Sequence, residues 1–312
     1  MLAKSLKINL QGFAFFYKLK SLHIQVFCFI WKKGLFVEVE FLDIGKGKIA
    51  FEDTKKDGPL TICLPGIGDL RSEYRFLEPE LTKAGYRVVT VDLRGQGDSS
   101  AWWPNYNIQV MANDLTDLVD YLDAGPAYLV GTGMSGAVVS IVASETPSKV
   151  AGLVLISAFI RDVPVSGGQR LNHKFLTMRP WGSNRWGNHY RGLYRAQKPA
   201  DLEDHINQLK KTMRQKNRLY ALKRLLQTTK EIGEPRMSQI EAPAMVITGS
   251  QDPEFPDPTW EGRYIAHCLG GVSEVLSIEG AGHYPHVEMP DQVNPAIAKF
   301  LTKAREFYKV TT

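Results

Sequence analysis

Hydrophobic and polar residues follow two alternating periods along most of this 312-residue chain. Residues Phe36–Phe41 alternate apolar and acidic side chains, a pattern typical of a half-buried strand. Short, mainly apolar runs predict further strands at Lys48–Phe51, Leu60–Leu64, Arg87–Val91, Ala127–Val130, Leu153–Ile156, Ala244–Thr248 and Glu274–Ile278. Apolar residues at helical spacing predict helices at Glu73–Ala84, Val110–Leu122, Ala137–Ser144 and Val293–Glu306.

This alternation of strands and helices predicts an α/β fold with a mostly parallel, doubly wound sheet. In such sheets ligands bind beyond the carboxyl ends of the strands. Loops at those ends are therefore expected to come together, and they contain Gly66, Gly131, Asp252 and His283.

One internal segment, residues 161–236, does not follow this alternation of strands and helices. It contains several aromatic residues, Trp181 and Tyr190 among them, and then a long helix-prone stretch from Asp201 to Glu231. We expect a helical cap inserted after the sixth strand. The core is then residues 34–160 and 237–312, and residues 1–33 form a basic and apolar N-terminal extension.

The composition restricts the class of protein. Hydrophobic residues make up 44% of the chain and charged residues 23%, which excludes a disordered or fibrous protein. The three cysteines, Cys28, Cys63 and Cys268, are too few and too widely spaced for a disulfide framework or a zinc site. We therefore expect no metal and no cofactor, and a reducing, cytoplasmic location.

The net charge of +5 is unevenly distributed. Residues 1–33 contain six lysines and no acidic residue, and residues 161–236 contain 17 basic and 6 acidic residues. No nucleic-acid-binding signature accompanies the basic segments, so nucleic acid is not an expected partner. The N-terminal apolar runs are too short to span a membrane, although they are compatible with a targeting or surface-attachment segment. The sequence does not indicate an oligomeric state.

Five motifs, taken in order, resemble the α/β-hydrolase fold family over about residues 35–310. They are Leu64–Gly68, Asp92–Ser99, Leu129–Gly136, Asp252 and Gly280–His283. The family carries out acyl transfer to a serine on a sharp strand-to-helix turn, the nucleophile elbow. The resemblance implies that His283 is the base, that Asp252 orients it, and that the N–H groups of Ile67 and Met134 form the oxyanion hole. Glu254 and Asp257 are alternative acids near Asp252.

The chain departs from the family pattern at the elbow itself. Aligning Leu129–Gly131 with the family's strand places Gly133, which has no side chain, at the nucleophile position. A second register, Gly133–Ala137, makes Ser135 the nucleophile, but it requires two extra residues between strand and turn. In the first register Ser135 lies in the first turn of the following helix, where capping or close packing is its ordinary role.

The resemblance implies hydrolysis of a small-molecule ester, lactone or related acyl substrate, with catalysis weakened or altered because Gly133 replaces serine. Five alternatives remain open, and the first is a serine hydrolase that uses Ser135. The histidine could activate water, or it could accept a proton in a cofactor-free reaction other than hydrolysis. The chain could instead be a non-catalytic ligand-binding protein, or Gly133 could be a substitution introduced to trap substrate. The sequence does not identify the substrate.

Overall fold

The structure is a computed structural model that describes residues 38–162 and 176–311, with side chains as far as residue 306. The chain divides into two compact units, Met1–Val37 and Glu38–Thr312, and the described residues belong to the second unit. The predicted N-terminal extension, residues 1–33, lies outside the described residues.

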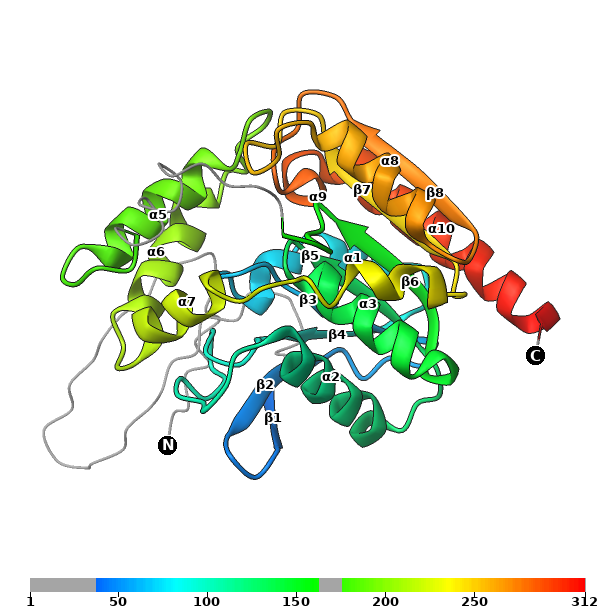
Figure 1. The fold of residues 1–312 in the computed structure, drawn as a ribbon, viewed down its shortest axis with the longest axis horizontal. Coiled ribbons are helices and arrows are strands. Elements are labelled where there is room, and N and C mark those ends of the chain that lie inside the picture. The colour runs from blue at the N-terminus through cyan, green and yellow to red at the C-terminus, as the bar shows by residue number, and fades with distance from the viewer. Residues whose placement is uncertain (1–37, 163–175, 312) are drawn as a thin grey trace, which may run out of the picture. The chain divides into compact units, whose positions relative to one another are not determined.

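A single eight-stranded sheet forms the centre of the described unit (Figure 1). Its strands, in the order β1-β2-β4-β3-β5-β6-β7-β8, are parallel from β4 to β8, and β2 pairs antiparallel with both β1 and β4. The bounds are β1 Val39–Asp43, β2 Lys48–Asp53, β3 Leu60–Leu64, β4 Arg87–Val91, β5 Ala127–Thr132, β6 Val150–Ile156, β7 Ala244–Gly249 and β8 Ser273–Ile278. The predicted fold class, a mostly parallel doubly wound sheet, is confirmed.

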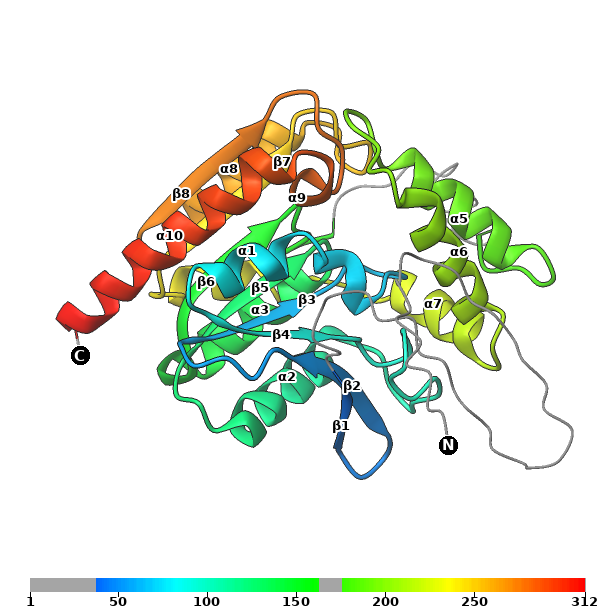
Figure 2. The same ribbon diagram turned by 180° about the vertical axis from the view of Figure 1, so that it is seen from behind.

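Helices cover both faces of this sheet (Figures 1 and 2). One face packs against α2 (Ile108–Leu122), α3 (Ser135–Glu145) and α8 (Pro258–Cys268), and the other against α1 (Leu77–Lys83) and α10 (Pro290–Thr311). Strand β5 shows why both faces are apolar. Leu129 is buried in the first core, while Tyr128 and Val130 point into the second.

The cap follows the sixth strand, as predicted. Its helices α5 (Gly182–Gly192), α6 (Leu202–Met213) and α7 (Arg218–Leu226) lie between β6 and β7 in the chain. Leu202, Ile206 and Leu209 recur at helical spacing on α6 and are buried. The helix-prone stretch from Asp201 is two helices and not one, because Asn217 adopts a left-handed backbone with φ of 66°.

The predicted helix Glu73–Ala84 is also interrupted. A 3-10 turn, η1 (Arg71–Tyr74), precedes α1, and the two are separated at Arg75 and Phe76. Pro79 explains the break, since its ring would clash with the carbonyl of residue 75 in a continuous helix. The remaining short elements are η2 (Pro147–Lys149), η3 (Glu234–Gln239) and α9 (Pro285–Glu288).

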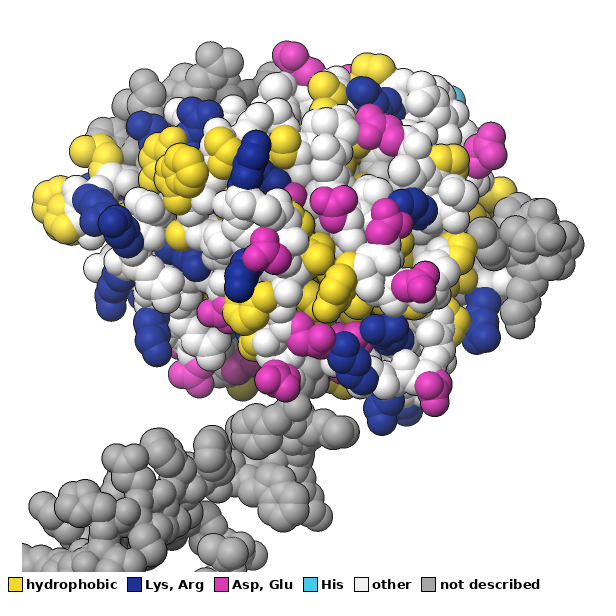
Figure 3. All heavy atoms as spheres, turned by 90° about the horizontal axis from the view of Figure 1, so that it is seen from below, with side chains coloured by type: hydrophobic (Ala, Val, Ile, Leu, Met, Phe, Trp, Pro, Cys, Tyr) yellow, Lys and Arg dark blue, Asp and Glu magenta, His cyan; other side chains and the backbone are white. Residues whose placement is uncertain are grey.

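Charged side chains are unevenly spread over the surface in Figure 3. Basic and apolar side chains gather at the left of that view, the side on which the cap helices lie in Figure 1, and acidic side chains are more frequent elsewhere. The cap's Met178, Trp181 and Tyr220 are each about half exposed. No helix within residues 38–162 and 176–311 is long and apolar enough to cross a membrane.

Candidate active site

Three loops that are far apart in the sequence meet at the carboxyl edge of the sheet. Gly133 follows β5, Asp252 follows β7 and His283 follows β8. The four strands from β5 to β8 are adjacent and parallel, so their carboxyl ends share one edge. This strand order brings the three loops to the same edge of the sheet, as expected from the sequence.

The imidazole of His283 and the carboxylate of Asp252 form a buried pair. Nδ1 of His283 lies 2.8 Å from Oδ2 of Asp252. The backbone holds both residues, because His283 N–H donates to the Leu193 carbonyl at 3.0 Å and Asp252 N–H donates to the Gly249 carbonyl at 3.1 Å. The pairing fixes the ring so that its other nitrogen, Nε2, faces away from Asp252.

The pair also sets the charge of the ring. Burial lowers the pKa of His283. The charge of Asp252 and its hydrogen bond raise this pKa by more than burial lowers it, and the resulting pKa is about 9. At neutral pH the protonated imidazolium therefore predominates, and the neutral form that accepts a proton is the minor species.

The alternative acids lie differently. Glu254 donates its N–H to Oδ1 of Asp252 at 2.9 Å, and burial raises the pKa of its carboxyl group. Asp257 instead caps α8, where its carboxylate accepts a hydrogen bond from the N–H of Trp260 at 2.9 Å. Asp252 is thus the carboxylate that contacts His283.

Gly133 occupies the sharp bend between β5 and α3. Its φ of 58° lies in the left-handed region, which glycine adopts without strain. Its N–H donates to the Ile156 carbonyl at 2.9 Å, and its carbonyl accepts the N–H of Phe159 at 2.9 Å. A Cβ built on Gly133 would lie 3.3 Å from Nε2 of His283. A hydroxyl one bond further out would be within hydrogen-bonding reach of that nitrogen.

Ser135 is placed two residues further on, at the start of α3. Its side chain is fully buried, and its hydroxyl donates to the Pro65 carbonyl at 2.6 Å. The hydroxyl therefore ties the loop after β3 to the helix after β5.

The two expected oxyanion donors flank the bend. Met134 directly follows Gly133 at the beginning of α3, and the Cα of Gly66 would be 3.9 Å from a Cβ on Gly133. On either side of Ile67, the N–H of Gly66 donates to Glu73 and that of Gly68 donates to Gln96. Among residues 38–162 and 176–311, neither the N–H of Ile67 nor that of Met134 has such a protein acceptor.

A buried acid that the motifs did not indicate supports this loop. Oε2 of Glu73 accepts the Gly66 N–H at 2.8 Å, and its Oε1 lies 3.3 Å from Nε2 of His286. Burial and the charge of Asp69 raise the pKa of Glu73, while burial lowers the pKa of His286 to about 3. His286 is fully buried. No sequence motif identifies this contact, which depends on burial of the whole loop.

Aromatic side chains form a wall beside the bend. Phe159 and Phe255 stack with ring centroids 4.4 Å apart, and Phe159 lies 5.9 Å from the ring of His283. From the cap, Trp186 donates its indole N–H to the Gly68 carbonyl at 2.9 Å. Among the described residues, no group of three or more His, Cys, Asp or Glu side chains is arranged to hold a metal ion.

A doubly wound sheet with a cap after β6, and an Asp–His pair facing a glycine bend, define an α/β-hydrolase architecture. The sequence model of the α/β-hydrolase fold matches residues 59–290, and the chain belongs to this family. The predicted membership of a hydrolase family is confirmed.

Individual relatives are more distant. The dihydrolipoyllysine-residue acetyltransferase component of the acetoin cleaving system of Pseudomonas putida is 28% identical over 269 residues, which cover 81% of this chain. They cover 66% of that protein, just under two thirds of its length.

Solved structures share the fold. A thermophilic esterase from Thermogutta terrifontis is 23% identical, with a TM-score of 0.70, and the match covers 86% of this chain and 99% of that one. A bromoperoxidase from Bacillus anthracis is 20% identical, with a TM-score of 0.75, and the match covers 85% and 100% of the two chains. At these identities the likeness supports the fold and no particular substrate.

Proposed function

We propose that this chain hydrolyses a small ester or related acyl substrate at the Gly133 bend, with catalysis altered by the absent serine. The observation that carries the proposal is that Nε2 of His283 lies 3.3 Å from where a side chain on Gly133 would begin. The cap, residues 161–236, would shape the pocket for the acyl substrate, and the three widely spaced cysteines favour a cytoplasmic location.

In the proposed reaction a water molecule takes the place of the serine hydroxyl. Neutral His283 accepts a proton at Nε2 while the water oxygen bonds to the acyl carbon. The N–H groups of Ile67 and Met134 stabilise the negative oxygen that forms. The tetrahedral intermediate then breaks its bond to the alcohol oxygen, which takes the proton back from His283. Asp252 stabilises the imidazolium that exists between these two proton transfers.

One observation favours a second candidate, a non-catalytic binding protein. With a pKa of about 9, His283 carries a positive charge at neutral pH and faces the same space as the two N–H donors. That combination suits a carboxylate, the product of ester hydrolysis, as a ligand.

Ester turnover separates the two candidates. Purified chain should hydrolyse p-nitrophenyl acetate faster than the buffer does, and His283→Ala should lower that rate by about 100-fold or more, the contribution typical of a general base. Ser144→Ala serves as a control because Ser144 lies near the far end of α3 (Ser135–Glu145), where its hydroxyl donates to the Ile141 carbonyl at 2.9 Å. Equal rates for the original chain and His283→Ala would reject hydrolysis at this bend and leave the binding protein.

A further inference from the structure

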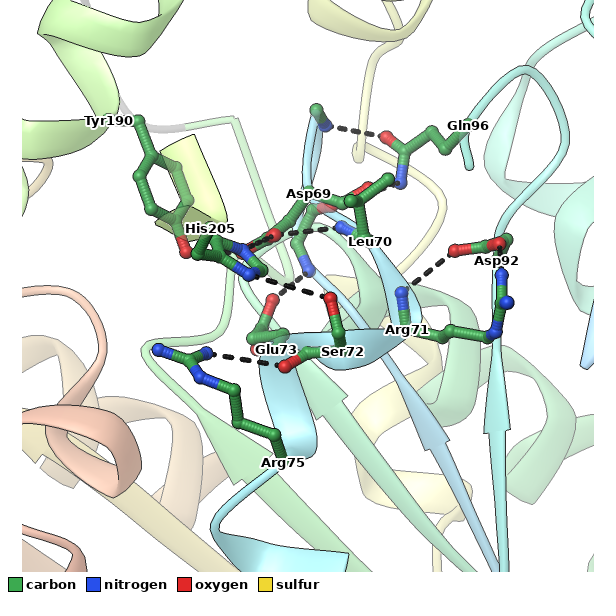
Figure 4. Close-up of polar contacts among 12 residues, drawn as sticks. Asp69, Leu70, Arg71, Ser72, Glu73, Arg75, Asp92, Gln96, Tyr190 and His205 are labelled. Atoms are coloured by element: carbon green, nitrogen blue, oxygen red, sulfur yellow. Dashed lines mark hydrogen bonds and ion pairs between the residues drawn. The ribbon is translucent and has the colours of Figure 1, made fainter. Parts of the chain in front are cut away.

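A second serine, histidine and aspartate lie together where the cap meets the core (Figure 4). His205, on cap helix α6, has its ring between Asp69 and Ser72, which belong to the loop and 3-10 turn after β3. Nε2 of His205 lies 2.7 Å from Oδ1 of Asp69, and Nδ1 lies 3.4 Å from Oγ of Ser72. The two ring nitrogens thus face an acid and a hydroxyl, the order that nucleophilic catalysis by serine requires.

The acid of this group is held in place and ionised. Oδ1 of Asp69 also accepts the Leu70 N–H at 2.7 Å, and Oδ2 accepts the hydroxyl of Tyr190 at 2.7 Å. Burial raises the pKa of Asp69. His205 and these donors lower it by more than burial raises it, so the pKa of Asp69 lies below its ordinary value. The neighbouring Glu73 has a raised pKa, which leaves Asp69 as the charged carboxylate of the two.

An ionised Asp69 selects the form of the histidine that can act as a base. In a neutral ring, the carboxylate takes the hydrogen bond from the Nε2–H, and the lone pair of Nδ1 then faces Ser72. The distance of 3.4 Å to Oγ is longer than a tight hydrogen bond. Catalytic contacts are often long in the absence of substrate and shorten when substrate binds.

The serine itself is accessible and lies beside a cation. Ser72 is only partly buried, whereas Ser135 is fully buried. Nη1 of Arg75 donates to the Ser72 carbonyl at 3.2 Å, which places a guanidinium beside the backbone of this residue. Arg75 is held by Asp201, and Asp201 lines a cavity of about 370 Å³ together with Phe76.

We propose that Ser72 is a nucleophile, with His205 as its base and Asp69 positioning the ring, and that this group accepts an acyl chain from an activated ester. In the first step Oγ of Ser72 bonds to the acyl carbon while its proton moves to Nδ1 of His205. The bond between the acyl carbon and the alcohol oxygen then breaks, and the alcohol leaves with that proton. Water then bonds to the acyl carbon and gives a proton to Nδ1 of His205. As the bond between the acyl carbon and Oγ breaks, His205 returns that proton to Oγ, which releases a carboxylic acid and free Ser72.

Covalent labelling tests the assignment without relying on turnover. The full chain is incubated with a fluorophosphonate probe, and peptide mass spectrometry locates the adduct. We expect the adduct on Ser72, its loss in Ser72→Ala, and normal labelling in the matched variant Ser144→Ala, whose serine lies on α3 and bonds to the Ile141 carbonyl.

The base is tested by His205→Gln. A glutamine can still donate a hydrogen bond to Asp69, so the tether between cap and core is kept while the base is lost. The labelling rate should fall by about 100-fold or more. His283→Ala should label normally, so this result is separate from any outcome at the Gly133 bend.

Two results would overturn the assignment. One is the absence of an adduct on Ser72 in folded chain that is exposed to excess probe. The other is an adduct that forms equally fast in His205→Gln. In either case Asp69 and His205 serve only to hold the cap against the core.

Discussion

At the scale of single residues, the proposed reaction depends on Gly133 and His283. Gly133 has a left-handed φ of 58° and no side chain. The imidazole of His283 beside it is hydrogen-bonded to Asp252. A histidine with a pKa of about 9 is mostly protonated at neutral pH. Any reaction that needs it as a base should therefore become faster as the pH rises towards 9.

The charge of His283 also predicts how stability depends on pH. Its pKa is about 6.5 in the unfolded chain and about 9 in the folded chain, so the folded state binds the proton more tightly. The stabilising contribution is fully present below pH 6.5 and is lost as the pH rises through about 9. It amounts to about 3 kcal/mol when each pKa unit is worth 1.36 kcal/mol.

Urea unfolding of the original chain and of His283→Gln between pH 6 and pH 10 measures this contribution. The free energy of unfolding should differ most at pH 6, and the difference should shrink by pH 10. Other titrating groups are common to both chains and cancel. A difference that is constant over this range would mean that the folded state does not raise the pKa of His283.

At the scale of elements, a buried ion pair holds α2 against the loop after β4. Nε of Arg94 donates to Oδ2 of Asp114 at 2.7 Å, and both side chains are almost fully buried. Removing the carboxylate would leave the guanidinium buried without its partner. We expect Asp114→Ala to lower the free energy of unfolding by about 3 kcal/mol.

The matched control is Asp120→Ala, on the same helix. Its carboxylate pairs with Lys149 at the surface, where ion pairs contribute about 0–1 kcal/mol. Chemical denaturation of the two variants gives the comparison directly. Equal losses of stability would show that the burial of Arg94 is not what makes its pair important.

The elements also show how far sequence patterns extend. The strands and the helices of the core follow from apolar periodicity, because each buries one or both faces against the sheet. The division at Asn217 depends on one residue's backbone conformation, and periodicity does not report it. The buried Glu73–His286 contact and the Ser72–His205–Asp69 group bring together residues that no local pattern links.

At the scale of the whole molecule, strand order assembles the site from distant parts of the chain. Gly133, Asp252 and His283 lie at the ends of β5, β7 and β8, and the sheet order sets these strands near one another. The fold could be predicted because the family pattern rests on this topology. The substrate could not, because specificity depends on how individual side chains line the site, and no sequence pattern reports that arrangement.

The proposed acyl-transfer site lacks only a hydroxyl at residue 133. Gly133→Ser supplies that hydroxyl, and Gly133→Ala supplies the same Cβ at the same φ without it, so the backbone strain is matched. Circular dichroism and thermal unfolding would establish that both variants are folded before their rates are compared.

The decisive measurement is the rate of p-nitrophenyl acetate hydrolysis by these two variants. Gly133→Ser should be faster than Gly133→Ala by at least about 100-fold, a small part of the roughly 10⁶-fold that loss of its serine costs a serine protease. The gain should disappear when His283→Ala is added. Equal rates for two folded variants would contradict the claim that His283 and Asp252 are arranged to activate a group at this bend.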